Sequence, residues 1–463
     1  MFARCRKCGE AFAERERRAS WQRGKNNIKP SASQAKILCD ARALLATAIL
    51  LSKLQMIIMA VVFNRESEDM SHLRYFTAGE SHGQALTGIL EGLPAGLEID
   101  EEYIAVQLHR RQQGYGRGGR MRIEQDRARI LSGVRFGKTL GSPIALEIEN
   151  RDWQNWQTKM STTPVAEEAA IKRVEIPRPG HVDLAGAIKY QTEDIRNVLE
   201  RASARETATR VALGALARKF LESLGIRLAS HVVQIQQAQS RYSLTNFGKA
   251  GFDFNLEELT QRAEASPVRC LDSTAEQEMI AVIDRAKAER DTVGGIFEVA
   301  AFNLPVGLGS HVQWDRRLDG RIAMAMMSIP AIKGVEIGNG FRGATQWGSE
   351  VHDQIYHSAE HGYHRSSNNA GGLEGGITNG QPLVVRVAKK PLSTLMRPLD
   401  SVNMRTKEAA EAHIERSDVC AVPAASVIGE AMLALALADA MLEKFGGDSM
   451  TEILSRWQQW STT

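Results

Sequence analysis

The sequence predicts an α+β fold rather than a doubly wound parallel sheet. Short segments rich in Val and Ile, such as PLVVRVAKK (382–390), indicate strands, and the long apolar segment PAASVIGEAMLALALADAMLEKFGG (423–447) indicates a mostly buried helix. These segments do not alternate regularly along the chain, as the βαβ units of a parallel sheet would require. The composition, with 43% hydrophobic and 24% charged residues, is typical of a soluble globular protein.

Residues 100–225 contain the next predicted helices and strands. Asp100 is expected to cap a helix over 101–111, because its carboxylate can accept hydrogen bonds from the first backbone N–H groups. Residues 128–150 indicate a strand, a turn containing Gly-Ser-Pro and a second strand. A long helix, or a pair of helices, is predicted over 194–224, and Gly225 ends it because glycine readily adopts the left-handed conformation of a helix end.

The second half of the chain carries the remaining predicted elements. HVVQIQ (231–236) and GGIFEVAAFNLP (294–305) are typical of strands. Residues 314–329 indicate a helix that stops before Pro330, because a proline disfavours helical geometry in the residue before it. Pro423 suits the first turn of the long helix, and the glycines at 446 and 447 suit its end.

Residues 1–69 differ from the rest of the chain. They hold 13 Lys and Arg against 7 Asp and Glu, three of the five cysteines, and none of the 11 histidines. The apolar stretch 43–63 contains Lys53 and Gln55 near its middle, which argues against a membrane span, and it starts too late for a secretory signal. We expect residues 1–69 to be a dispensable, largely disordered extension upstream of a true start at Met70, and 70–463 to form the functional domain.

Charge and cysteine usage narrow the function classes. Residues 70–463 hold 45 Lys and Arg against 48 Asp and Glu, so this part lacks the net basic character of most nucleic-acid binders. The five cysteines are too few and too scattered for a disulfide framework, which suits a reducing compartment. Cys5 and Cys8 form a CxxC, but the same segment holds no second pair and no histidine to complete a zinc site.

The loop GYGRGGR (114–120) is open to several interpretations. It contains a formal GxGxxG, but a helix is predicted before it, whereas dinucleotide-binding loops follow a strand. A single RGG is weak evidence for RNA contact. The loop could also be a solvated surface turn. Alternatively, Arg111, Arg117 and Arg120 converge on one multiply charged anion, because the guanidinium fork suits carboxylates and phosphates.

Two histidines are candidates for proton transfer. His82 lies in the glycine-flanked GESHG (79–83), and His181 follows Pro179-Gly180 beside Arg178. Imidazole titrates near neutral pH, so a histidine held in a constrained turn suits acid–base chemistry, although a lone histidine is more often structural. Ser81 is adjacent to His82, but there is no GxSxG elbow to indicate a hydrolase.

Four further histidines lie in VHDQIYHSAEHGYHR (351–365). His357 and His361 have the i, i+4 spacing that can bind zinc on a helix. The segment lacks the glutamate of an HExxH motif and leads into a Gly- and Asn-rich stretch. A polar loop is therefore the favoured interpretation over a metal site, and no metal is assigned.

A series of motifs carries a family resemblance over about residues 70–450. In chain order they are GESHG, RRQQGYGRGGRM, RPGHVDL, RASARETATR, SIPAIKGVEIGNGF, NNAGGLEGGITNGQP, KKPLSTL and ERSDVCAVPA. Their identity and order resemble the chorismate synthase family. So many ordered motifs make the resemblance specific.

The resemblance implies a carbon–oxygen lyase acting on phosphates. Members of this family convert 5-enolpyruvylshikimate 3-phosphate to chorismate and phosphate by an anti-1,4-elimination in the shikimate pathway of aromatic amino acid biosynthesis. It also implies a β-α-β sandwich with helices between antiparallel sheets, a cytoplasmic homotetramer, and a requirement for reduced FMN, which some members reduce with NADPH.

The resemblance also assigns roles to individual residues. His82 would protonate the leaving phosphate, His181 would keep the reduced flavin in its working protonation state, and Asp418 would relay a proton at the flavin N5. The positions assigned to substrate are Arg111, Arg117, Arg120, Arg178, Arg205 and Arg416. The positions assigned to the flavin are Arg111, Arg117, Arg201, Ala202, Ser203, Pro330, Ala331, Gly375, Lys390, Pro391, Leu392, Ser393, Thr394 and Arg416.

Two other classes of protein are the alternatives. A flavin or nicotinamide oxidoreductase would consume reductant at every turnover. An anion- or RNA-binding module would bind RNA in a salt-sensitive way and without flavin.

Overall fold

The computed structural model of the chain describes residues 72–119, 125–166, 171–415 and 417–461. The predicted extension over 1–69 lies outside these residues, as do Arg120 and Arg416. The helices, strands and contacts given below all lie within these residues.

A four-stranded antiparallel sheet has the strand order β1-β2-β6-β3. Its strands are β1 (Arg74–Ala78), β2 (Ala85–Glu91), β3 (Ala128–Ile130) and β6 (Ile144–Glu149). Leu86, Leu90 and Ile148 are buried, whereas Phe76 and Ile89 are exposed. Side chains alternate between the two faces of a strand, so one face of this sheet packs on the core and the other is exposed.

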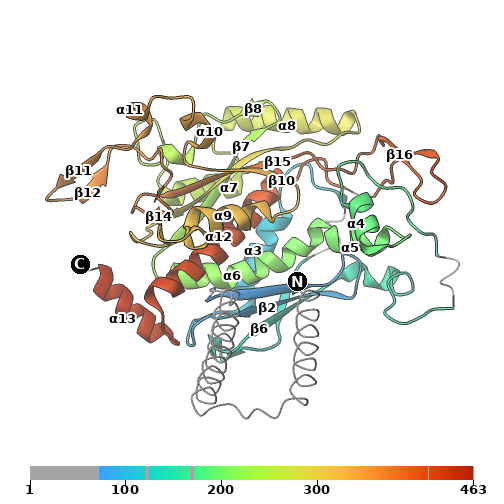
Figure 1. Cartoon of the computed structure of the whole chain (residues 1–463), viewed down its shortest axis with the longest axis horizontal. Helices are drawn as coiled ribbons and strands as arrows, with labels where there is room; N and C mark the ends of the chain where they lie inside the picture. Colours follow the sequence, from blue (N-terminus) through green and yellow to red (C-terminus); the bar gives the residue numbers. More distant parts are fainter. Residues whose placement is uncertain (1–71, 120–124, 167–170, 416, 462–463) are drawn as a thin grey trace, which may run out of the picture. The chain divides into compact units, whose positions relative to one another are not determined.

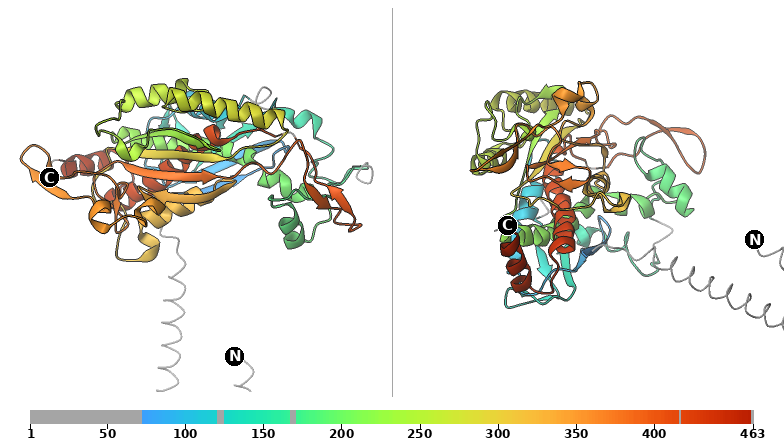
Figure 2. Two further views of the ribbon diagram at one scale, coloured as in Figure 1. Left: turned by 90° about the horizontal axis from the view of Figure 1, so that it is seen from above. Right: turned by 60° about the vertical axis from the view of Figure 1, so that its left-hand side comes forward.

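A five-stranded antiparallel sheet has the order β10-β15-β9-β7-β8. Its strands are β7 (Arg227–Ile235), β8 (Ala238–Gln239), β9 (Gly295–Phe302), β10 (Ile332–Ile337) and β15 (Leu383–Lys389). Neighbouring residues of one strand belong to different buried clusters: Val385 joins the main core, and Val384 joins a second cluster with Leu259 of α7 (Leu256–Ala265). Both faces of this sheet are therefore covered, and α8 (Ser273–Ala288) packs against β8 and β7 at one edge of the sheet, with most of its buried residues in the main core (Figure 2).

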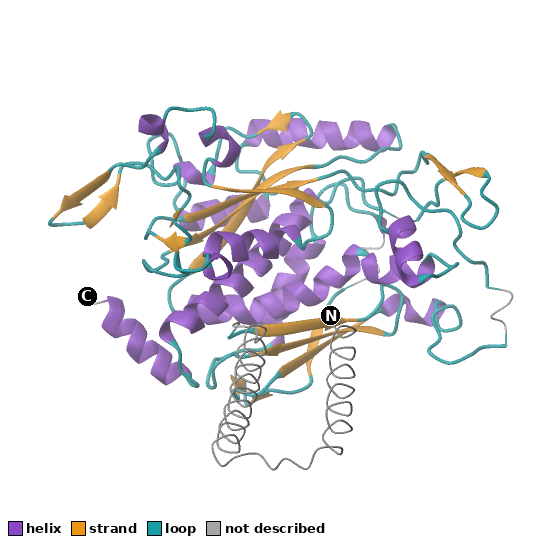
Figure 3. Ribbon diagram, in the orientation of Figure 1, coloured by secondary structure: helices purple, strands orange, loops and turns teal. Residues whose placement is uncertain are grey.

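Two long helices occupy the space between these sheets (Figures 1 and 3). Helix α6 (Thr207–Ser223) packs against β2 and β6, and α12 (Val422–Phe445) packs against β7 and β9. The two helices also pack against each other, and a Cβ atom at Gly214 would lie 2.5 Å from that of Ala431. Glycine at this position therefore permits the close approach of the helices. Helices α3 (Glu101–Gln112) and α9 (Leu318–Met327) flank α12.

Helix α12 is a core helix. It is the one helix of the described residues with the length and apolar composition of a membrane span, but 94% of its apolar window is buried inside the protein. The predicted proline in its first turn is present, and Gly446 follows its last residue with φ 59°. The prediction of a mostly buried helix here is confirmed.

The other elements are short or peripheral. The remaining helices are α4 (Asp183–Tyr190), α5 (Arg196–Ala202), α10 (Gly340–Gly343), α11 (Gly348–Val351) and α13 (Met450–Ser461), with 3-10 turns η2 (Arg151–Asn155), η4 (Ala204–Glu206), η5 (Leu244–Asn246) and η6 (Trp314–Arg316). The two-stranded hairpins pair β4 (Val134–Arg135) with β5 (Lys138–Thr139), β11 (Ile355–Ser358) with β12 (Gly362–Arg365), β13 (Leu373–Glu374) with β14 (Ile377–Thr378), and β16 (Asp400–Val402) with β17 (Ala409–Glu411).

The α+β prediction is confirmed, and most predicted elements are present. Asp100 caps α3 by accepting from the Tyr103 N–H at 2.7 Å. The helical region over 194–224 is a pair of helices, α5 and α6, joined by η4, and Gly225 has φ 77°. The segment with four histidines differs from the expected polar loop, because it forms the β11–β12 hairpin. His357 and His361 are therefore not on a helix, and the zinc spacing does not apply.

Candidate active site

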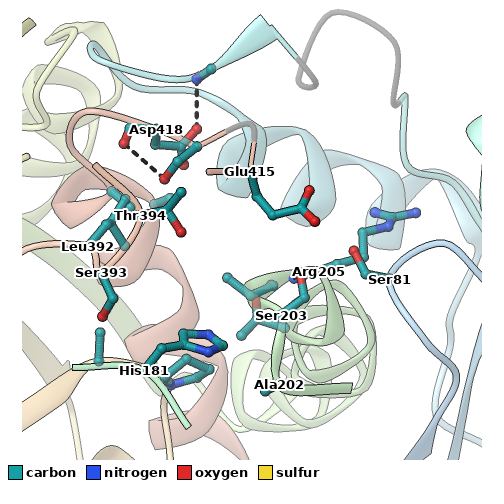
Figure 4. Close-up of a pocket in the computed structure, with 18 of the residues that line it drawn as sticks. Ser81, His181, Ala202, Ser203, Arg205, Leu392, Ser393, Thr394, Glu415 and Asp418 are labelled. Atoms are coloured by element: carbon teal, nitrogen blue, oxygen red, sulfur yellow. Dashed lines mark hydrogen bonds between the residues drawn. The ribbon is translucent and has the colours of Figure 1, made fainter. Parts of the chain in front are cut away.

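Segments distant in the sequence line a cavity of about 510 Å³. This volume is within the usual range for small-molecule sites. The lining comes from the β1–β2 turn, the loop after α3, the loop before α4, the α5–η4 region, the α9–β10 turn, the residues after β15 and the start of α12. Figure 4 shows Leu392, Ser393 and Thr394 on one side of the cavity and Arg205 and Ser203 on the other.

His82 is held in a tight turn after β1. Gly79 has φ 103°, and a Cβ atom there would lie 2.4 Å from the carbonyl oxygen of Ala85, so the turn requires glycine. The His82 ring is buried and stacks on Trp156, with 3.9 Å between ring centroids. Its Nδ1 lies 2.9 and 3.1 Å from the two carboxylate oxygens of Glu200. The turn and the carboxylate together fix the orientation of this imidazole.

His181 lies in a second constrained loop and also contacts a buried carboxylate. Its Nδ1 is 2.5 Å from Oδ1 of Asp183, and Arg178 pairs with the same carboxylate at 2.8 and 3.1 Å. Burial tends to raise the pKa of Asp183, but the hydrogen bonds from His181 and Arg178 lower this pKa well below its ordinary value. A charged Asp183 therefore orients both the histidine and the arginine.

Arg111 and Arg205 converge on one buried carboxylate. Asp126 lies 2.5 Å from Arg205 Nη1 and 3.4 Å from Arg111 Nη1. Arg111 also donates to the Thr207 hydroxyl and the Ala204 carbonyl, and Arg205 donates to Asn150 Oδ1. Burial lowers the pKa of Arg111 to about 10, so the guanidinium remains charged at neutral pH. Asp126 thus holds two cations side by side at the cavity wall.

The glycine-rich loop contacts the segment before α12. Arg117 Nη1 lies 2.6 Å from Asp418 Oδ2, and the Gly118 N–H donates to Asp418 Oδ1 at 2.7 Å. Figure 4 places Asp418 above Thr394 at the cavity. Arg117, Gly118 and Asp418 all line the cavity. The solvated-turn interpretation is therefore wrong for this part of the loop.

The segment after β15 fastens the His181 loop. Lys390 Nζ and the Ser393 hydroxyl both donate to the carbonyl of Gly180, Ser393 at 2.9 Å. The Thr394 hydroxyl accepts from Arg178 Nη1 at 2.9 Å. The neighbouring Ala331 has φ 69°, a left-handed conformation that is uncommon for a residue with a Cβ atom. Such outliers gather at functional sites.

The structure brings most predicted site residues to this one cavity. The predicted residues that line it are His82, Arg111, Arg117, Arg178, His181, Ala202, Ser203, Arg205, Pro330, Ala331, Lys390, Leu392, Ser393, Thr394 and Asp418. Arg201, Gly375 and Pro391 are not among the lining residues. The Arg201 guanidinium instead donates to the backbone carbonyls of Thr77 and Gly79, so it braces the His82 turn.

Several residues of the site were not predicted from the sequence. Glu200 and Trp156 flank His82, and Asp126 joins two arginines. Lys389 is buried at the cavity, and burial lowers its pKa to about 8. Asp183 alone had a local signal, because it follows His181 by two positions in RPGHVDL.

The charges at the cavity favour an anionic ligand with several negative groups. The described lining holds four arginines and two lysines against Glu415 and Asp418. The hydrogen bond from His413, more than any other contact, lowers the pKa of Glu415 to about 2, so this group stays ionised. Guanidinium groups fixed by carboxylates can bind phosphate or carboxylate without further ordering. Two oriented histidines beside them can exchange protons with a bound anion.

Comparisons with known proteins agree with this chemistry. The family model described as chorismate synthase matches residues 73–442. A chorismate synthase of Desulforudis audaxviator is 59% identical over 388 residues, which is 84% of this chain and 97% of the relative. One of Aquifex aeolicus is 56% identical over 394 residues, covering 84% and 98%. A crystal structure of chorismate synthase matches with a TM-score of 0.67 and 48% identity, covering 84% of this chain and 97% of that one.

These matches span most of the chain and nearly the whole length of each relative. The relatives are enzymes, and their name describes a lyase. This protein belongs to the chorismate synthase family.

Proposed function

We propose that this enzyme converts 5-enolpyruvylshikimate 3-phosphate to chorismate and phosphate, and that it requires reduced FMN. The observation that carries the proposal is the arrangement of the cavity. Two histidines, each with Nδ1 on a buried carboxylate, lie among four arginines in one cavity. The substrate has a phosphate and two carboxylates, so the arginines match its charge and the histidines can protonate what leaves.

The residues present fit a bound flavin. One part of the lining is apolar, with Ile329, Pro330, Ala331, Ala424 and Ile428, and suits the flat ring system. The cationic side chains nearby suit the flavin phosphate. The residues that would hold the flavin are Ala202, Ser203, Pro330, Ala331 and the run Lys390 to Thr394. When bound, reduced FMN supplies the electron density that eases departure of the phosphate with no net redox change.

The protein's own groups then carry the remaining steps. Arg111, Arg117, Arg178 and Arg205 bind the anionic groups and stabilise negative charge on the departing phosphate. His82 donates a proton to that phosphate, and His181 holds a proton toward the flavin ring. Asp418, which pairs with Arg117 at the cavity, would relay the proton at the flavin N5. The fold that supports these positions is the β-α-β sandwich of the family, with α6 and α12 as its central layer.

An anaerobic assay tests the proposed function. The enzyme is mixed with 5-enolpyruvylshikimate 3-phosphate and photoreduced FMN, with and without NADPH, and chorismate is followed by absorbance. We expect chorismate only when the flavin is reduced. Formation from oxidised FMN plus NADPH would show that the enzyme also reduces its own flavin. No chorismate with photoreduced FMN would contradict the proposal.

We extend the proposal to a cytoplasmic homotetramer, as in the family. Support comes from Trp314, Phe341 and Trp347, which are large, strongly exposed aromatic side chains of the kind that a subunit interface covers. Light scattering during gel filtration measures the assembly directly. A monomer at micromolar concentration would contradict it.

Arg117→Ala is expected to weaken substrate binding by roughly 1.5–3 kcal/mol, about a ten- to hundredfold rise in Kd, because it removes a charge-assisted contact. The melting temperature is expected to fall only modestly, because Arg117 lies on a loop outside the core, although its loss leaves Asp418 without this ion pair. Titration with substrate in the presence of oxidised FMN measures the Kd. Arg127→Ala is the matched control, because Arg127 is an exposed arginine of the same region that pairs with Glu102 and does not line the cavity. A large drop in melting temperature with unchanged affinity would show that the role of Arg117 is structural.

Residues 70–463 expressed alone are expected to be soluble and fully active. The family model begins at residue 73, and relatives are matched over 97–98% of their length by 84% of this chain. Activity and assembly of 70–463 are compared with those of the whole chain. An inactive or aggregated product, or whole-chain enzyme in the membrane fraction, would show that 1–69 has a real anchoring or folding role.

A further inference from the structure

The Glu200 carboxylate contacts both the backbone and the ring of His82. One of its oxygens accepts the backbone N–H of His82 at 2.9 Å and also lies 2.9 Å from Nδ1 of the ring. The other oxygen lies 3.1 Å from the same Nδ1 and accepts from Arg196 at 2.7 Å. The Glu200 side chain is 1% exposed, so solvent screens these contacts little.

The carboxylate of Glu200 stays ionised in this setting. Burial tends to raise the pKa of Glu200, but the hydrogen bonds and charge of His82, together with the hydrogen bond from Arg196, lower this pKa below its ordinary value. A charged carboxylate can only accept hydrogen bonds, so its contact with Nδ1 requires a proton on that atom. The His82 ring is then either the neutral Nδ1–H tautomer or the doubly protonated imidazolium. In both forms Nδ1 keeps its proton, so Nε2 is the atom that gives a proton to a ligand or accepts one from it.

Trp156 holds the ring against this carboxylate. The Trp156 ring stacks on His82 with 25° between the planes, and the guanidinium of Arg196 lies 5.0 Å from the Trp156 centroid. The charged and titratable groups around the His82 loop and Trp156 in the described residues are Glu80, Asp152, Lys159, Arg196, Glu200, Arg201 and, through Arg196, Glu415. Of the three carboxylates nearest the loop and Trp156, Glu200 is the one whose oxygens meet the imidazole.

From this geometry we infer that Glu200 is the positioning residue that keeps His82 protonated, with Nε2 as the proton donor to the leaving phosphate. The inference rests on the proposed role of His82. A carboxylate within about 4–6 Å favours a charged partner and shifts the partner's pKa by about 1–3 units. The charge of Glu200 favours the doubly protonated imidazolium of His82 over the neutral ring, because the carboxylate lies within hydrogen-bond distance of Nδ1.

Glu200→Gln tests the inference because it removes the charge and retains an oxygen that can accept from His82. The alkaline limb of the kcat–pH profile is expected to move to lower pH by about one unit or more. At a pH above that limb, kcat falls about tenfold for each unit of the shift, while KM changes little. Glu200→Asp keeps the charge and should keep the limb near its original position.

Glu206→Gln is the matched control. Glu206 is also buried, lies six residues further along, pairs with Arg210 and does not line the cavity. Its substitution should leave the limb unchanged. Binding of oxidised FMN and the melting temperature show whether each variant is folded.

A second readout does not depend on activity. Protonated histidine quenches the fluorescence of a stacked tryptophan, so the pH-dependent difference between the enzyme and its His82→Ala variant reports the ionisation of His82 beside Trp156. In a Glu200→Gln background the midpoint of this difference should fall by the same amount as the kinetic limb. An unchanged midpoint, or a limb that stays in place in Glu200→Gln, would overturn the inference.

Different experimental results would contradict the proposed function and the role of Glu200. If the unmodified enzyme makes no chorismate, the function is wrong, yet the fluorescence titration still tests the Glu200–His82 pair. If His82→Ala keeps its activity, the role of His82 is wrong. If His82→Ala is inactive and Glu200→Gln behaves as unmodified enzyme, only the role of Glu200 is wrong.

Discussion

His82→Ala and His181→Ala are each expected to reduce kcat for chorismate formation by about 10²–10⁴-fold, the usual contribution of a general acid or base. Each histidine is fixed by a buried carboxylate, His82 by Glu200 and His181 by Asp183, so its proton is presented in one direction. An alanine leaves the arginines in place. Substrate affinity should therefore change far less than kcat.

The measurement is steady-state turnover with photoreduced FMN, together with binding of oxidised FMN to each variant. His109→Ala is the control, since His109 is exposed at the end of α3 and does not line the cavity. It should retain full activity. If the alanine variant at position 82 or 181 keeps kcat within about threefold of the unmodified enzyme, that histidine is not the general acid or base.

Glu430→Gln is expected to destabilise the enzyme by about 3–5 kcal/mol, because it leaves buried positive charge without compensation. Glu430 lies on α12, and its carboxylate meets three arginines: Arg110 at 2.8 and 3.0 Å, Arg269 at 3.4 Å, and Arg218. Burial tends to raise the pKa of Glu430, but the charges of these arginines lower it far below its ordinary value. Glutamine has nearly the same shape as glutamate but no charge, so the decrease in the free energy of unfolding measures the electrostatic contribution of Glu430.

Denaturant unfolding followed by circular dichroism measures this loss. Glu91→Gln provides the contrast, because the Glu91–Arg74 pair is about half exposed and should contribute less than about 1 kcal/mol. Since the pKa of Glu430 is lowered in the folded state, its contribution to stability is present above the ordinary glutamate pKa and is lost as the pH falls below it. Equal unfolding midpoints for Glu430→Gln and the unmodified enzyme would contradict this account.

Local patterns in the sequence predicted several of the elements and both histidines, but not helices α7 and α8. Asp100 as a helix cap and the buried helix α12 follow from spacing within about 25 residues, which is the range over which propensity and periodicity act. His82 and His181 were found because glycine constrains their turns and because the motifs around them match a family. The short hairpin β4–β5, inside a predicted turn, and β11–β12, in a predicted loop, carried no such signal.

The partners of the site residues could not be predicted in the same way. Glu200 meets His82 across 118 positions, and Asp126 meets Arg205 across 79, so only the folded chain brings them together. Tertiary contacts also place one predicted flavin residue, Arg201, outside the cavity lining. The Arg201 guanidinium donates to the carbonyls of Thr77, in β1, and Gly79, in the turn after it, so it is bound to the protein backbone.

The stoichiometry of one anaerobic turnover tests the central claim most directly. Enzyme and reduced FMN are mixed with a limiting amount of 5-enolpyruvylshikimate 3-phosphate, and chorismate, phosphate and the flavin spectrum are measured together. The account predicts one chorismate and one phosphate for each substrate consumed, with the flavin still reduced at the end. Flavin oxidised in proportion to product would contradict it and would make the protein an oxidoreductase, and phosphate released without chorismate would contradict the proposed elimination.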